Sequence, residues 1–150
     1  MFYIFFNEKT LNKKLIYNVI IKKNKRQISL KGYIDTGNTL CDIMTGKSVI
    51  LCEFEKVKIL FDDNLKDCFE KDNCLSFEKL DEKIIKKWGI RFIPFCDYSG
   101  NGILTAFTPD KVIINYENKK ITFEDVLVGI RLKSFEKQYS VLLNQNMVLN

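Results

Sequence analysis

Short runs of β-branched and aromatic residues, separated by turn-forming residues, recur along most of this 150-residue sequence. Such runs are typical of strands, and the Asn, Asp, Gly and Pro residues between them favour tight turns. The candidate strands are residues 15–21, 28–34, 48–54, 91–98, 103–107, 111–116 and 121–130. Roughly seven or eight strands joined mainly by short turns predict a mostly β fold that closes into a barrel.

One or two helices complete the predicted fold. Residues 75–89 (LSFEKLDEKIIKKWG) place Leu80, Ile84, Ile85 and Trp88 on one face, with Gly89 at the expected C-terminal cap. Residues 139–147 (YSVLLNQNM) are interpreted as a second, short helix. The intervening segment from about residue 55 to 75 has the mixed pattern of loop and short helix.

The chain is expected to form a single domain over residues 1–150, because no repeat, linker or low-complexity block divides it. Hydrophobic residues make up 46% and charged residues 29%, a balance typical of globular domains. The net charge of +5 is spread among acidic residues. The most basic stretch is a turn at residues 22–27 that lacks interleaved aromatic side chains, so we predict no nucleic-acid partner.

The sequence contains no histidine. This excludes Ser-His and Cys-His nucleophiles and most zinc sites. Its cysteines are odd in number and contain no C-x-x-C pair, so we predict reduced thiols and neither a metal nor a cofactor. They are Cys41, Cys52, Cys68, Cys74 and Cys96. The apolar cluster at residues 2–6 is too short to span a membrane; it is either a first strand or a stub beyond a membrane segment.

The stretch IDTGNT places Asp35 directly after an apolar strand. Three interpretations are open: an Asp-initiated turn, a D-x-G-x-T phosphate loop of the actin and hexokinase type, or half of an aspartic peptidase site. The phosphate-loop fold needs a longer chain and a second phosphate loop, and neither is present. Peptide hydrolysis by carboxylates needs two of them together, and the chain has one D-T-G. The peptidase interpretation therefore requires two chains, each supplying Asp35 across a two-fold axis.

The order of these features resembles the retropepsin-like aspartic peptidases. More closely, the chain resembles the protease domain of the sporulation sigma-E factor-processing peptidases of endospore-forming bacteria. The matching segments are GYIDTGNTLCDIMTGKSVIL at 32–51, IRFIPFCDYSGNGILTAFTPDKVII at 90–114, DVLVGI at 125–130 and YSVLLNQNM at 139–147. They occur in family order and are spread across about three quarters of the chain, from residue 32 to residue 147.

The resemblance implies a homodimeric aspartic endopeptidase with a retropepsin-like barrel and one catalytic half-site per chain. Asp35 matches the catalytic aspartate, and Thr36, Gly37 and Asn38 complete its loop. The flap tip over the substrate would consist of Ser99, Gly100, Asn101 and Gly102. The chain departs from the family near its C-terminal end, where members often carry His-Pro and this sequence has Asn144-Gln145.

The same resemblance implies partners and a location. Family members carry an N-terminal membrane-spanning half, which this chain lacks, so we expect a soluble domain from the cytoplasmic side of the membrane. The expected substrate is the inactive pro-sigma-E factor, and the full-length enzyme is expected to respond to a signal protein secreted from the forespore. The alternative function is a non-catalytic binding or dimerisation module with a protease-like fold.

Overall fold

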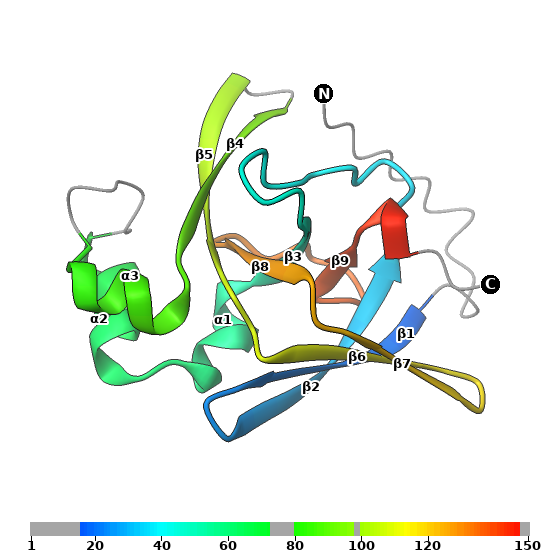
Figure 1. The fold of residues 1–150 in the computed structure, drawn as a ribbon. Coiled ribbons are helices and arrows are strands. Elements are labelled where there is room, and N and C mark those ends of the chain that lie inside the picture. Colours follow the sequence, from blue (N-terminus) through cyan, green and yellow to red (C-terminus); the bar gives the residue numbers. More distant parts are fainter. Residues whose placement is uncertain (1–15, 73–79, 98–99, 148–150) are drawn as a thin grey trace.

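The strands of the protein form one bent sheet, seen in a computed structural model that describes residues 16–72, 80–97 and 100–147 (Figure 1). Within these residues the sheet has nine strands, in the order β4-β5-β8-β3-β9-β2-β1-β6-β7. They are β1 (Ile16–Lys23), β2 (Arg26–Ile34), β3 (Ser48–Glu53), β4 (Arg91–Asp97), β5 (Gly100–Phe107), β6 (Lys111–Tyr116), β7 (Lys119–Phe123), β8 (Val126–Arg131) and β9 (Val141–Leu143). The predicted mostly β fold is confirmed.

Local turn chemistry explains the hairpins. β1 and β2 pair antiparallel around Asn24 and Lys25, whose φ angles of 50° and 68° are left-handed and suit a two-residue hairpin turn. β4 and β5 also pair antiparallel, and this hairpin rises away from the rest of the sheet (Figure 1). Pro94 lies in β4, where its missing N–H is tolerated because β4 is the last strand at its end of the described sheet.

The strand β9 comes from near the C-terminal end of the sequence and lies between β2 and β3. It pairs parallel with β2, from Gly32 opposite Val141, and antiparallel with β3. The prediction of a helix over residues 139–147 is therefore wrong for the central part, and only Gln145–Met147 forms a single 3-10 turn, η4. Two strands distant in sequence supply the hydrogen bonds of β9, and a three-residue strand has no local signature of its own.

The helices lie together at one end of the molecule (Figure 1). They are α1 (Phe54–Val57), the 3-10 helix η3 (Lys58–Leu60), α2 (Asp63–Asp72) and α3 (Glu82–Trp88). The predicted cap at Gly89 is confirmed, with φ of 58°, but α3 begins only at Glu82, since the Asp81 side chain accepts a hydrogen bond from the Lys83 N–H. Residues 75–79 of the predicted helix lie outside the described residues. Across the described ranges, every helix is too short or too polar to cross a bilayer.

Two hydrophobic cores stabilise this arrangement. The larger core lies between the helices and the sheet, and Phe61 is at its centre, with ring centroids 5.4 Å from Trp88 and 5.4 Å from Phe107 in edge-to-face contacts. The smaller core includes Leu40 and Tyr139. Because Leu40 belongs to the loop that follows Asp35, this second core supports the candidate site.

Candidate active site

Asp35 directly follows β2, as the sequence predicts, and its side chain is buried, with 5% of the residue exposed. Its N–H donates to the Leu143 carbonyl oxygen at 3.4 Å, and its own carbonyl oxygen accepts the Asn38 N–H at 3.0 Å. The Gly37 N–H donates to carboxyl atom Oδ1 at 2.9 Å. The other carboxyl oxygen, Oδ2, is buried without a hydrogen-bond partner among the described residues. One carboxyl oxygen is therefore held in place, while the other has no hydrogen-bond partner in the part of the chain that the structure describes.

Burial raises the pKa of Asp35, because a desolvated carboxylate loses its hydration, and the Gly37 N–H lowers it by a smaller amount. The net direction is upward, so Asp35 keeps its proton to a higher pH than an ordinary aspartate. A carboxyl with a raised pKa suits a group that must donate a proton or share one with a second carboxyl.

Two tyrosines lie beside this carboxyl. Tyr33 and Tyr139 stack on each other, with ring centroids 5.1 Å apart and an interplanar angle of 18°. Burial raises the pKa of both phenols, and the charge of Asp35 raises them further. Sequence reasoning missed both residues. The position of Tyr33, two residues before Asp35, was an available signal, whereas nothing in the sequence pointed to Tyr139.

The rest of the predicted catalytic loop divides into a buried and an exposed part. Asn38 is fully buried, and its Nδ2 donates to the Val49 carbonyl oxygen at 3.2 Å and the Leu142 carbonyl oxygen at 3.4 Å. The Asn38 Oδ1 accepts the Leu40 N–H at 3.1 Å. Thr36, by contrast, is exposed.

Asn144 and Gln145, the residues at which the sequence departs from the His-Pro of the family, contact the same loop. Asn144 is fully buried, and the Gln145 N–H donates to the Asn38 carbonyl oxygen at 2.8 Å. Sequence reasoning noticed the departure without assigning it a structural role. The available signal was a polar residue that ends the apolar run at 141–143.

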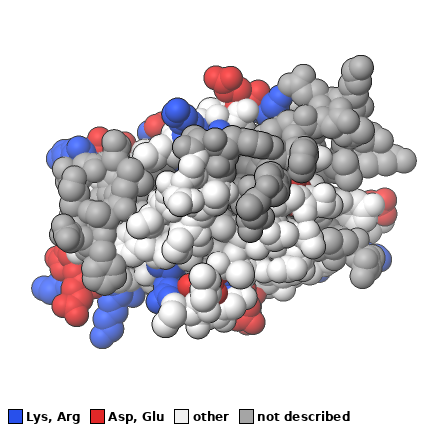
Figure 2. Space-filling model, turned by 90° about the horizontal axis from the view of Figure 1, so that it is seen from above, with Lys and Arg blue, Asp and Glu red and all other residues white. Residues whose placement is uncertain are grey.

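A groove of about 650 Å³ lies between this loop and the β4–β5 hairpin. It is lined by Thr39, Leu40, Cys41, Pro94, Phe95, Cys96, Asn101, Gly102 and Ile103. None of these side chains is charged. Asp35 does not itself line the groove, which begins four residues further along the loop. From the side on which the hairpin rises, the middle of the described surface is also mostly uncharged, with charged residues near its edges (Figure 2).

The predicted flap residues are divided by the structure. Ser99 lies outside the described residues. Gly100 begins β5 with a φ of 118°, while Asn101 and Gly102 are paired strand residues that line the groove. A Cβ atom at Gly102 would lie 2.7 Å from Cζ of Phe95, its partner across the hairpin. Gly102 therefore makes room for an aromatic ring, and the role of these residues as a flap stays a prediction.

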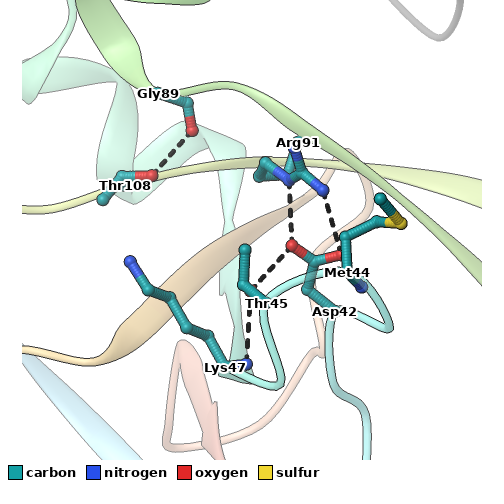
Figure 3. A network of polar contacts seen from close by, with 7 residues as sticks. All are labelled: Asp42, Met44, Thr45, Lys47, Gly89, Arg91 and Thr108. Carbon is teal, nitrogen blue, oxygen red and sulfur yellow. Dashed lines mark hydrogen bonds and ion pairs between the residues drawn. The ribbon is translucent and has the colours of Figure 1, made fainter.

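The loop continues into a turn that begins at Asp42 and is stabilised by hydrogen bonds to the Asp42 side chain (Figure 3). The Asp42 carboxylate accepts hydrogen bonds from the Met44 N–H at 3.2 Å and the Thr45 hydroxyl at 2.9 Å. Arg91, the first residue of β4, reaches the same carboxylate. The two sides of the groove are therefore joined at its base by charged hydrogen bonds.

The other two buried carboxylates of the described chain have partners of their own. Asp42 is held as described above, and Glu53 Oε2 accepts the Phe135 N–H at 2.9 Å. No cluster of three or more Cys, Asp or Glu side chains suited to a metal ion occurs in the described ranges. Among the described residues, Asp35 is the buried acid with a buried carboxyl oxygen that has no hydrogen-bond partner.

Comparison with known proteins identifies the family of this chain. The sequence profile of the family described as "Sporulation factor SpoIIGA", a peptidase family, matches residues 1–147. The chain belongs to this family. A relative of the SpoIIGA-family chain, the sporulation sigma-E factor-processing peptidase of Priestia megaterium, is 29% identical over 138 residues, which are 89% of this chain and 44% of the relative. The chain thus spans less than half the length of that relative. No solved structure matches the chain.

Proposed function

We propose that this chain is the catalytic domain of an aspartic endopeptidase that acts as a homodimer on the pro-sequence of the inactive sigma-E factor. Family membership supports a peptidase, and the name of the Priestia megaterium relative supports the substrate. The observation that carries the aspartic type is the buried Asp35 carboxyl, whose Oδ2 has no partner among the described residues.

The proposed chemistry follows from the electrostatics of two adjacent carboxyls. When two copies bring their Asp35 side chains to about 3 Å, both cannot ionise, so they share one proton. The protonated carboxyl polarises the scissile carbonyl, while the ionised one takes a proton from the attacking water. The raised pKa of Asp35 in a single chain favours this shared state. Thr36, exposed in one chain, is available for hydrogen bonds to the loop of the second.

The groove beside the loop is the proposed binding site for the substrate chain. Its uncharged lining favours an extended peptide with apolar or small polar residues near the cleaved bond. Strand β4 ends the described sheet and can offer main-chain groups to such a peptide, except at Pro94. In this proposal the β4–β5 hairpin is the flap, a retropepsin-like feature, and closes over the bound chain.

The wider setting is proposed from the family. The full-length enzyme carries its membrane-spanning half before this domain, acts on the cytoplasmic side and responds to a signal protein secreted from the forespore. Neither a nucleic acid nor a cofactor takes part in the proposed reaction.

Replacing the aspartate tests the proposal. Asp35→Asn keeps the shape of the side chain and the acceptor for the Gly37 N–H, so the chain should stay folded. Coexpressed with pro-sigma-E factor, this variant should lose about 10²–10⁴-fold in cleavage rate. Unchanged cleavage would rule out the carboxyl pair. If neither the unaltered chain nor Asp35→Asn cuts the pro-factor, although both are folded and bind it, the chain has the alternative function of a binding module.

A further inference from the structure

A second fully buried asparagine, Asn144, lies against the Asp35 loop. Its Nδ2 donates to the Leu40 carbonyl oxygen at 2.8 Å and to the Val49 carbonyl oxygen at 3.2 Å. Its Oδ1 accepts the Asn146 N–H at 3.0 Å. Both donors and the acceptor of this buried amide are therefore used, which is the arrangement that makes a buried polar side chain stable.

Asn38 and Asn144 act on the same two residues from opposite sides. The Val49 carbonyl oxygen accepts a hydrogen bond from each side-chain amide, at 3.2 Å in both cases. Leu40 is held at both polar atoms of its main chain: its N–H donates to Asn38 and its carbonyl oxygen accepts from Asn144. We call these two side chains the asparagine clasp. It fixes the end of the catalytic loop to β3 and to the segment after β9.

The clasp also reaches the catalytic residue through the main chain. The Gln145 N–H donates to the Asn38 carbonyl oxygen at 2.8 Å, and the Asp35 N–H donates to the Leu143 carbonyl oxygen at 3.4 Å. The loop from Asp35 to Leu40 is thus bonded at its beginning, middle and end to residues 143–145. Since the Asp35 side chain projects from this loop, the last residue of β9 and the two residues after it help to set where its carboxyl lies.

We propose that Asn144 is a positioning residue for catalysis, whose side-chain amide holds the 35–40 loop in the geometry that presents the Asp35 carboxyl to its partner. This inference rests on the proposed peptidase function. A purely stabilising residue would affect only the folding of the chain. Here two copies of the loop must meet, so a small displacement in each copy adds to the error in the position of one Asp35 carboxyl relative to the other. A displacement of about 1 Å in a catalytic group can reduce a rate by about 10²-fold.

The test compares two substitutions. Asn144→Asp keeps the size and the acceptor of the side chain but removes both donors. Asn146→Ala is the matched control, because it removes only an exposed bond from Asn146 Nδ2 to the Ser48 hydroxyl at 3.2 Å. With purified pro-sigma-E factor, we expect Asn144→Asp to lower kcat about 10²-fold, and the control to match the unaltered chain. Asn144→Ala, which adds no buried charge, repeats the test if the aspartate variant does not fold.

A second readout does not depend on activity. Amide hydrogen exchange at Gly37 reports directly on the bond to the Asp35 carboxyl, and we expect it to quicken roughly tenfold or more in folded Asn144 variants. Folded variants with unchanged kcat and unchanged exchange at Gly37 would overturn the proposal. If the unaltered chain cuts no substrate, the peptidase function fails, and the exchange measurement still decides whether Asn144 holds the loop.

Discussion

The guanidinium of Arg91 holds the buried carboxylate of Asp42 with two hydrogen bonds, of 2.9 Å from Nε to Oδ2 and 3.4 Å from Nη2 to Oδ1 (Figure 3). Asp42 ends the loop that begins at Asp35, and Arg91 begins the β4–β5 hairpin. The two residues therefore connect one side of the groove with the other. The hairpin is anchored where it starts, whereas its far end rises clear of the sheet (Figure 1).

Breaking this contact should destabilise the fold. Arg91→Met keeps much of the side-chain length and removes the charge, leaving Asp42 buried with fewer partners. We expect a loss of about 1–3 kcal/mol in the free energy of unfolding, measured by denaturant titration. Lys87→Met is the control, because the Lys87–Asp62 pair is more exposed and should contribute only about 0–1 kcal/mol. Equal losses in the two variants would contradict a special role for Arg91.

The contact between Arg91 and Asp42 should also make the stability of the fold depend on pH. Burial raises the pKa of Asp42, but the hydrogen bonds from Arg91, Thr45 and Met44, with the Arg91 charge, outweigh it, so the pKa lies below its ordinary value. A depressed folded pKa means that the ionised group stabilises the fold above the unfolded value near about pH 4. That contribution is lost as the pH falls through the folded pKa. The stability advantage of the unaltered chain over Arg91→Met should therefore narrow below about pH 4.

The contribution of Asp35 to the stability of the fold should depend on pH in the opposite direction. Its folded pKa is raised by burial, so the fold binds this proton more tightly than the unfolded chain does. The associated stability is present below the unfolded pKa of about 3.9 and is lost as the pH rises through the folded pKa. Asp35→Asn, which has no charge to bury, should therefore be more stable than the unaltered chain at neutral pH. Melting temperatures from pH 3 to pH 7 should show the difference vanishing in acid; a difference independent of pH would contradict it.

Mixed dimers should reveal whether the site is shared between two chains. If each active site needs Asp35 from both copies, coexpressing unaltered and Asp35→Asn chains in equal amounts leaves about a quarter of randomly paired dimers intact. Cleavage of pro-sigma-E factor should then fall to about a quarter of the level expected for complete pairing of unaltered chains. A fall to only one half would mean that each chain acts alone. Sedimentation with and without substrate provides the accompanying measure of association.

Gly102 should control the shape of the groove. A methyl group there would meet the Phe95 ring at 2.7 Å, so Gly102→Ala should displace that ring and alter the groove wall. We expect a raised KM for the substrate with kcat less affected, since the Asp35 loop does not contact Gly102 in the described hydrogen-bond network. Adding Phe95→Leu to Gly102→Ala should recover part of the lost affinity. If the double variant recovers none of the lost affinity, the Phe95 ring is not the cause of the raised KM.

Sequence reasoning located the elements that have strong local signals. The hairpin turn at Asn24, the helix cap at Gly89 and the position of Asp35 at the end of a strand all depend on neighbouring residues, and all three are found in the structure. The start of α3 was misplaced because Leu80 fits the apolar pattern of the helix, although Asp81 caps it afterwards. Pattern alone does not separate a buried residue in a helix from one just before it.

The candidate site was only partly predictable, for a different reason. The D-T-G-N loop is contiguous, so its residues could be named from sequence. Its supports, Tyr139 and Asn144, lie about a hundred residues away, and only the pairing of β9 between β2 and β3 brings them near. That pairing depends on tertiary contacts, which override the weak local preference of residues 139–147.

The insertion of β9 has a consequence for the order of events during synthesis. The hydrogen bond from Asn38 to the Leu142 carbonyl oxygen spans 104 residues, and contacts of such long range form late because much chain must be ordered first. A nascent chain that has emerged from the ribosome only as far as β8 holds Asp35 without the strand that anchors it. If the chain is the proposed peptidase, the loop that carries Asp35 reaches its anchored position only after β9 has been made and has paired with β2 and β3.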